Sequence, residues 1–87
     1  MEHSFKSFNK DLAIFKLFKS KVEIDDLIEK LENLNSKTKH EEIVVLKDQL
    51  EGLMHSPGAG SIMAKNQSLP QITQKLLLHL NHFGEIF

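Results

Sequence analysis

Residues 20–54 decide the fold, and they read SKVEIDDLIEKLENLNSKTKHEEIVVLKDQLEGLM. Large apolar residues recur in this stretch at spacings of three and four, first over 24–34 and again over 43–53. This spacing places the apolar side chains on one face of a helix. The polar turn Asn35-Ser36-Lys37 separates the two segments, and turns of this length join antiparallel neighbours. The stretch therefore predicts a helical hairpin whose two apolar faces meet.

Three capping boxes mark expected helix starts. They are Ser20-Lys-Val-Glu23, Thr38-Lys-His-Glu41 and Ser68-Leu-Pro-Gln71. In such a box the hydroxyl accepts a backbone N–H of the first turn, and the Glu or Gln side chain accepts the N–H of the capping residue. With the apolar periodicity, the boxes predict helices over about 21–34, 39–54 and 69–83, the last ending at a left-handed Gly84.

A basic, phenylalanine-rich segment precedes the hairpin and predicts a first helix over about 4–19. Its apolar residues fall within one arc of a helical wheel, and four lysines lie on or beyond the edges of that arc. The arc consists of Phe5, Phe8, Leu12, Phe15 and Phe18. We expect this face to join the core, with the lysine stems along its flanks. The alternative is a membrane-surface helix that places Phe at the headgroup boundary and Lys on anionic lipid.

The loop 55–61 interrupts the helical pattern, because it contains Pro57 and two glycines. Residues 62–65 are expected to add one short helical turn. The sequence Gly58-Ala-Gly60-Ser61 lacks the preceding strand and the Gly-Lys-Ser/Thr ending of a phosphate-binding loop, so we expect no nucleotide there. The whole chain, 1–87, is thus predicted to be one all-α domain, a small antiparallel bundle of four helices around the central hairpin 20–54. An open three-helix core with a detachable first helix is the second choice.

Composition narrows the classes of function. A chain of 87 residues has room for one modest core, and the absence of cysteine excludes disulfides and thiolate chemistry. Residues 1–21 carry five Lys against two acids, or +3, whereas residues 22–54 carry four Lys against nine acids, or −5. Every cation is lysine and the centre is acidic, which argues against nucleic-acid binding. Abundant Lys without Arg is typical of an AT-rich bacterial or phage genome.

The sequence also indicates where the protein resides. No uninterrupted apolar run exceeds four residues, far fewer than a membrane span needs, and the N-terminus lacks the pattern of a secretory signal. We therefore expect a cytoplasmic protein, although delivery by a specialised secretion system stays open.

No catalytic constellation is found, so we expect neither an enzyme nor a cofactor. No serine lies in a Gly-x-Ser-x-Gly elbow, and no carboxylate pair is isolated among apolar residues. A histidine-based metal site is one alternative, because His79 and His82 lie three apart near Glu85. Such a site would need His40 or His55 as a further ligand.

Five large apolar residues do not fit the expected helix faces. They are Ile14, Leu17, Val44, Val45 and Leu78. They either widen the core or form an exposed apolar surface, and such surfaces bind partners. The sequence therefore predicts a small non-enzymatic protein–protein interaction module of the adaptor, inhibitor or effector type. Its partner would be another protein, or a second copy in a homodimer, bound through these five residues.

Overall fold

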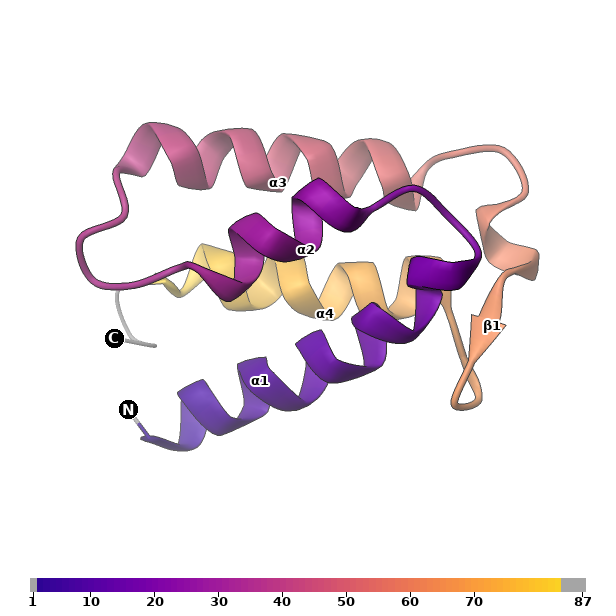
Figure 1. Ribbon diagram of the computed structural model, residues 1–87, viewed down its shortest axis with the longest axis horizontal. Helices are drawn as coiled ribbons and strands as arrows, with labels where there is room; N and C mark the ends of the chain where they lie inside the picture. Colours follow the sequence, from indigo (N-terminus) through magenta and orange to yellow (C-terminus); the bar gives the residue numbers. More distant parts are fainter. Residues whose placement is uncertain (1, 84–87) are drawn as a thin grey trace.

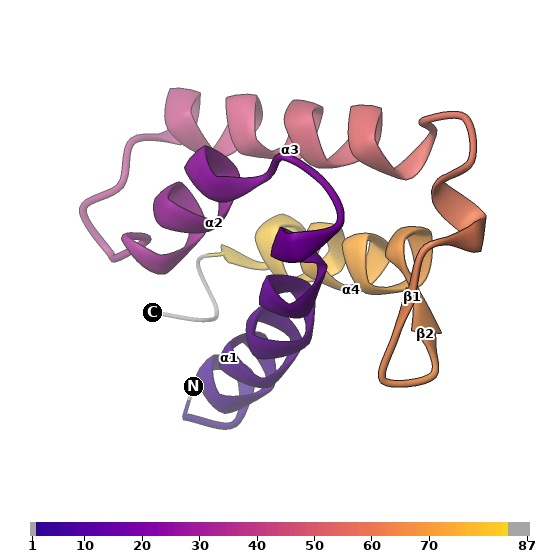
Figure 2. The ribbon, with the colours of Figure 1, turned by 45° about the vertical axis from the view of Figure 1, so that its right-hand side comes forward.

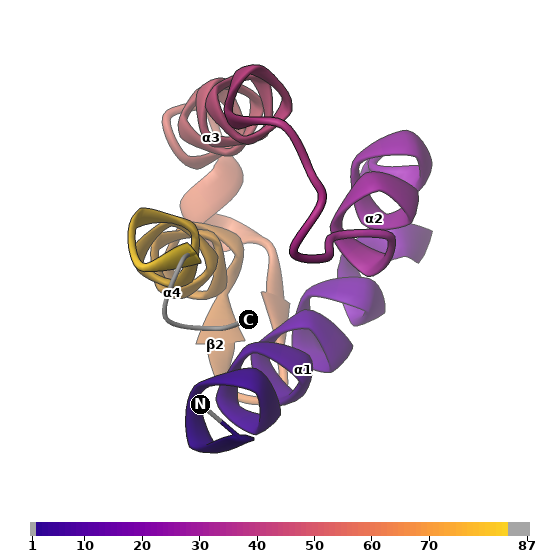
Figure 3. The same ribbon diagram turned by 90° about the vertical axis from the view of Figure 1, so that its left-hand side faces the viewer.

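The C-terminal helix α4 (Leu69–Asn81) is the element against which the other long helices pack. The computed structural model describes residues 2–83, and the side chains of residues 6–83. Figure 3 shows α4 between α3 (His40–Met54) and α1 (Glu2–Lys16), with α2 (Asp25–Glu32) on the far side of the core. The apolar face expected for the last helix lines this core: five of its residues are buried, and Phe83, just beyond α4, is half-buried. The buried residues are Leu69, Ile72, Leu76, Leu77 and Leu80.

The described part of the chain is mostly helical, with four α-helices, but the regular antiparallel bundle is not confirmed. Successive helices reverse direction along the molecule (Figure 1), yet α1 is steeply inclined to α3 and α4 (Figure 2). The predicted central hairpin is also not the centre of the fold, because α3 packs mainly on α4 and much less on α2. With only eight residues, α2 is too short to cover the length of α3.

Helix α1 places its phenylalanine face in the core, as expected. Phe8, Phe15 and Phe18 are buried, and so is Leu12 between them, whereas the side chain of Phe5 lies outside the described ones. The predicted helix 4–19 corresponds to α1 followed by one 3-10 turn, η1 (Leu17–Ser20). The tighter turn ends the helix at Ser20, because the chain then turns away toward α2.

The capping box expected at Ser20 does not form. Helix α2 begins at Asp25, four residues later than predicted, and its N-cap Ile24 makes no side-chain cap. Ile24 is buried and Val22 is half-buried, so the segment 21–24 packs its apolar side chains in a non-helical conformation instead. Asp25 and Asp26 in the first turn favour the helix start through its dipole.

The capping box expected at Thr38 does not form either, although α3 begins within one residue of the prediction. The N-cap is Lys39, without a side-chain cap. Thr38 Oγ1 accepts the backbone N–H of Asn35 at 3.0 Å, and Asn35 Oδ1 accepts that of Lys37 at 2.7 Å. The hydroxyl is thus used to close the turn before α3 rather than to cap the helix.

The third box, at Ser68, is confirmed. The Gln71 N–H donates to Ser68 Oγ at 3.3 Å, and the Ser68 N–H donates to Gln71 Oε1 at 2.7 Å. Pro70 lies in the first turn, where no intrahelical N–H is needed. Helix α4 ends at Asn81, and the predicted Gly84 cap lies outside the described residues, as do Glu85, Ile86 and Phe87.

A small β-hairpin replaces the helical turn expected at 62–65, so the structure is not all-α. After the 3-10 turn η2 (Ala59–Ser61), strand β1 (Met63–Ala64) pairs antiparallel with β2 (Gln67–Ser68). The two linking residues, Lys65 and Asn66, have φ of 52° and 63°. Two successive positive φ values define the tight turn whose twist matches a hairpin. Lysine is a rare residue in this turn, which is why the sequence pattern did not indicate it.

Candidate functional site

Four of the five apolar residues predicted to bind a partner are exposed. Leu17 is 44%, Val44 46%, Val45 50% and Leu78 50% exposed. The fifth, Ile14, is half-buried and packs against the core. Ile14 is therefore a peripheral core residue in this fold, and exposed apolar side chains remain at the other four positions.

The exposed residues come from three different helical elements. Leu17 lies in η1, Val44 and Val45 in α3, and Leu78 in α4. Met63, in β1, is a further exposed residue at 46% that sequence reasoning missed. Strand β1 lies beside η1, where the Lys21 ammonium donates to the Met63 carbonyl at 2.9 Å. Helix α3 differs from the other elements in that two of these exposed residues, Val44 and Val45, are adjacent in it.

A groove lies between α2 and α3 and encloses about 570 Å³. Its apolar lining comes from both sides: Leu34 follows α2, and Val45 and Leu46 belong to α3. Leu34 and Leu46 are buried, whereas Val45 keeps half of its surface exposed. The groove exists because the short α2 leaves part of α3 uncovered. Val45 is the most accessible apolar side chain along it.

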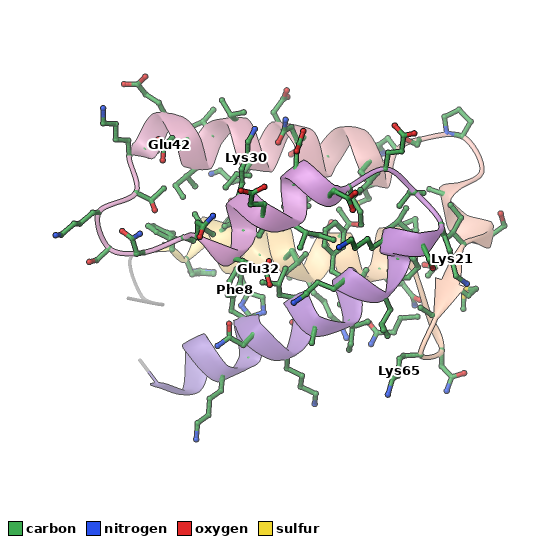
Figure 4. The ribbon with its side chains drawn as sticks, in the orientation of Figure 1. Phe8, Lys21, Lys30, Glu32, Glu42 and Lys65 are labelled. Atoms are coloured by element: carbon green, nitrogen blue, oxygen red, sulfur yellow. The ribbon has the colours of Figure 1, made fainter. Side chains whose placement is uncertain are left out.

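The rim of this groove is acidic. It consists of Asp26 and Glu29 from α2, and Glu41 and Glu42 from α3, with Lys30 as the one cation among its lining residues. Figure 4 labels Lys30 and Glu42, which come from the two facing helices. A second hollow of about 700 Å³ shares Asp26 and extends the acidic rim to Glu23 and Asp25. Four carboxylates against one ammonium give the first groove a formal charge of −3.

The basic helix α1 neutralises little of this acidic surface. Lys16 Nζ lies 2.7 Å from Glu32 Oε2, and this half-exposed pair joins α1 to α2. Glu32 does not line the groove between α2 and α3. Among the described side chains, the ion pairs are Lys16–Glu32 and His79–Asp11, so the rim carboxylates of the groove have no ion-pair partner there.

A partly buried pair links α1 to α4 and was not predicted. His79 Nε2 lies 2.7 Å from Asp11 Oδ2, and the two side chains are 18% and 13% exposed. The Phe8 ring meets the imidazole edge-on, with centroids 5.7 Å apart. An ionised carboxylate only accepts, so this hydrogen bond needs the proton on Nε2. Asp11 lies three residues after Phe8 on the apolar arc of α1. A carboxylate within an apolar helix face is the sequence feature that could have indicated this pair.

The geometry of this pair is that of a cross-link between helices. Within the described side chains, neither partner is hydrogen-bonded to a serine or threonine hydroxyl. His79 Nε2 is also committed to Asp11, which removes one nitrogen from the predicted metal site. Over the described residues, no group of three or more His, Asp or Glu side chains is placed to hold a metal ion, and Glu85 lies beyond them.

The membrane-surface alternative requires the phenylalanine face of α1. That face is occupied by the core, because Phe8, Phe15 and Phe18 are each at most 2% exposed. Over the part of the chain that the structure describes, no helix combines the length and the apolar character that crossing a membrane requires.

Comparison of the chain with models of known protein families, with curated proteins and with solved structures gave no match.

Proposed function

We propose that the protein is a small protein-binding module that acts without turnover, as an adaptor, inhibitor or effector does. The observation that carries this proposal is the pair of half-exposed valines, Val44 and Val45, in the first half of α3. The same helix already buries Ile43, Leu46 and Leu50, so its apolar residues exceed what the core uses. An apolar excess on a well-packed helix is typical of a surface that another molecule covers.

The energetics favour such a role. Burying a valine side chain fully contributes about 1.5–3 kcal/mol of favourable free energy. Because each of these valines is about half exposed, a partner that covers it would gain roughly half of that amount. A few such residues, surrounded by polar ones, are sufficient to anchor an interface. Leu78 on α4 is a further exposed anchor near α3, and Lys47 Nζ on α3 donates to Asn81 Oδ1 on α4 at 3.4 Å.

Site-specific photo-cross-linking tests this proposal. A photoreactive residue is placed at position 44, 45 or 78, with position 10 on the basic face of α1 as the control. The proteins captured are then purified, and their affinity is measured for the wild type and for Val44→Gln/Val45→Gln. We expect capture from the test positions and a loss of affinity of about tenfold in the double variant, with an unchanged circular dichroism spectrum.

Light scattering at two concentrations separates the two classes of partner. A mass of two chains that falls to one chain in the double variant identifies the partner as a second copy. A chain that cross-links to nothing from any test position, or a folded double variant that binds its partner as the wild type does, contradicts the proposal.

A further inference from the structure

From the groove between α2 and α3 we infer the chemical class of the partner: a cationic, amphipathic helical segment. This inference rests on the proposed function and deepens it, because it names one of the exposed surfaces and what that surface binds. Three observations carry it: an apolar floor, an acidic rim and the length of the groove.

The floor supplies anchoring contacts for apolar side chains. Leu34 and Leu46 form its buried base, and Val45 stands half-exposed beside them. The neighbouring valine, Val44, does not line the groove, although it is exposed to a similar extent. An amphipathic helix presents apolar residues at positions i, i+3 or i+4, and i+7, and laying this face into an apolar groove is a common mode of recognition. Val45 is therefore the residue that such a helix would cover.

The rim determines the sign of the partner's charge. Asp26 and Glu29 lie on one side and Glu41 and Glu42 on the other, and all four side chains are exposed. An anionic segment would bring like charges together on both flanks, whereas Lys or Arg flanking the apolar stripe would meet carboxylates on both sides. The acids of the second hollow, Glu23 and Asp25, continue the same sign beyond the groove.

The dimensions favour a short helix. The eight residues of α2 extend for about 12 Å, which matches roughly two turns of a helix lying beside it. The groove volume of about 570 Å³ accommodates a few large apolar side chains rather than a whole domain.

A second copy of this chain fits the groove less well. Its basic element is α1, whose Phe8, Phe15 and Phe18 are already buried in its own core. The exposed face of α1 offers lysines such as Lys6 and Lys10, and, among the described residues, the large apolar side chains beside them are limited to the half-buried Ile14 and, in η1, the exposed Leu17. The charge of a second copy matches the rim, but beside these lysines it offers the floor one exposed large apolar side chain, Leu17, rather than a full apolar stripe.

Designed peptides test the inference directly on the full chain. The probe is an 18-residue peptide of Leu, Ala and Lys with one leucine stripe flanked by lysines. Two matched peptides replace every Lys by Glu, or scramble the order so that the stripe is lost. Fluorescence anisotropy of the labelled peptides is measured at low and at high salt. We expect the Leu/Lys peptide to bind, more weakly as salt rises, and the two matched peptides to bind at least about tenfold more weakly.

Matched variants of the protein locate the site. Val45→Gln should weaken the Leu/Lys peptide about fivefold, and Val44→Gln less than about twofold, because only the first valine lines the groove. At low salt, Glu41→Gln/Glu42→Gln should weaken it by roughly threefold to tenfold. Asp48→Asn/Glu51→Gln makes the same change of net charge on α3 outside the groove and should have a smaller effect.

Four results would overturn the inference. They are equal binding of the Leu/Glu peptide, equal effects of the two valine variants, no binding of the Leu/Lys peptide, and a dimer that Val45→Gln converts to a monomer. The last result assigns the groove to a second copy. The proposed function is judged separately, because cross-links from positions 44 and 78 to a protein partner would stand even if the groove took no cationic helix.

Discussion

Removing the Asp11 carboxylate should destabilise the protein markedly, even though Asp11 is a single polar residue among the apolar side chains of α1. Asp11 Oδ2 and His79 Nε2 lie 2.7 Å apart, and their side chains are only 13% and 18% exposed. The two residues are 68 positions apart in the sequence, so the contact fastens α1 directly to α4. Asp11→Ala therefore removes one of the specific polar contacts between these helices and leaves the imidazole partly buried without its partner.

The magnitude follows from the burial and from the charge of the carboxylate. A hydrogen bond to a charged group contributes about 1.5–3 kcal/mol to the free energy of unfolding. Alanine has a higher helix propensity than aspartate, which offsets up to about 0.7 kcal/mol of this loss. We expect the free energy of unfolding to fall by about 1–2 kcal/mol. A domain of this length has about 4–13 kcal/mol in total, so the variant should remain folded. Its melting temperature should fall by about 10 °C.

A double-mutant cycle isolates the pair. Asp11→Ala, His79→Ala and the double variant are unfolded with urea and followed by circular dichroism at 222 nm, because the chain has no Trp or Tyr for fluorescence. We expect a coupling energy of about 1.5 kcal/mol. The matched control is the surface pair Lys16–Glu32, also 2.7 Å apart but 46% and 45% exposed, for which we expect less than about 0.5 kcal/mol.

Additive single effects would refute this reasoning. A coupling energy below about 0.3 kcal/mol for Asp11 and His79, or one no larger than that of Lys16 and Glu32, would mean that the contact does not stabilise the packing of α1 on α4.

Further predictions concern the caps and the glycines, and urea unfolding checks each of them. Ser68→Ala should lower the free energy of unfolding by about 1 kcal/mol because it removes a formed capping box, whereas Ser20→Ala should change it by less than about 0.5 kcal/mol; equal effects would contradict this. Gly52→Ala should stabilise α3 by up to about 1 kcal/mol, since its added Cβ meets nothing within 4 Å. Gly58→Ala should instead destabilise by about 1 kcal/mol, because φ is 80° there; a stabilised Gly58→Ala would contradict the left-handed turn.

The helices themselves could be predicted from the sequence because apolar periodicity is local information. The buried face of α4 from Leu69 to Leu80 and that of α1 from Phe8 to Phe18 are both confirmed. Periodicity does not say which face meets which, and the expectation that the two arms of 20–54 pack chiefly on each other was wrong. Helices α3 and α1 instead pack on the long apolar face of α4, because the eight residues of α2 offer too little surface to cover α3.

The capping boxes show the limit of a local motif. The same pattern formed a cap at Ser68, where Leu69 is buried directly after it. At Ser20 the burial of Ile24 held the chain out of the helix, and at Thr38 the hydroxyl bonded to Asn35 instead. The hairpin after residue 62 was missed because its turn uses Lys65, a residue without a turn preference.

The candidate site was predicted only in part. Three residues outside the apolar faces expected from the helical wheels are exposed, because only one face of each helix packs on the core. They are Val44, Val45 and Leu78. The groove could not be predicted, since it depends on where α2 begins and how far it reaches along α3. Asp11 was missed because a lone carboxylate on an apolar arc acquires its partner only in the tertiary structure, across 68 residues.

The most direct test is an NMR titration of the ¹⁵N-labelled chain with the Leu/Lys peptide. We predict that the backbone amide shifts change along the groove, at Lys30, Glu42 and Val45, while those around Leu17 and Lys65 stay in place. Shifts centred on Leu17 and Met63, or on Leu78, would place the binding surface elsewhere. Amide signals that do not move at all would contradict the groove as a binding site for a cationic helix.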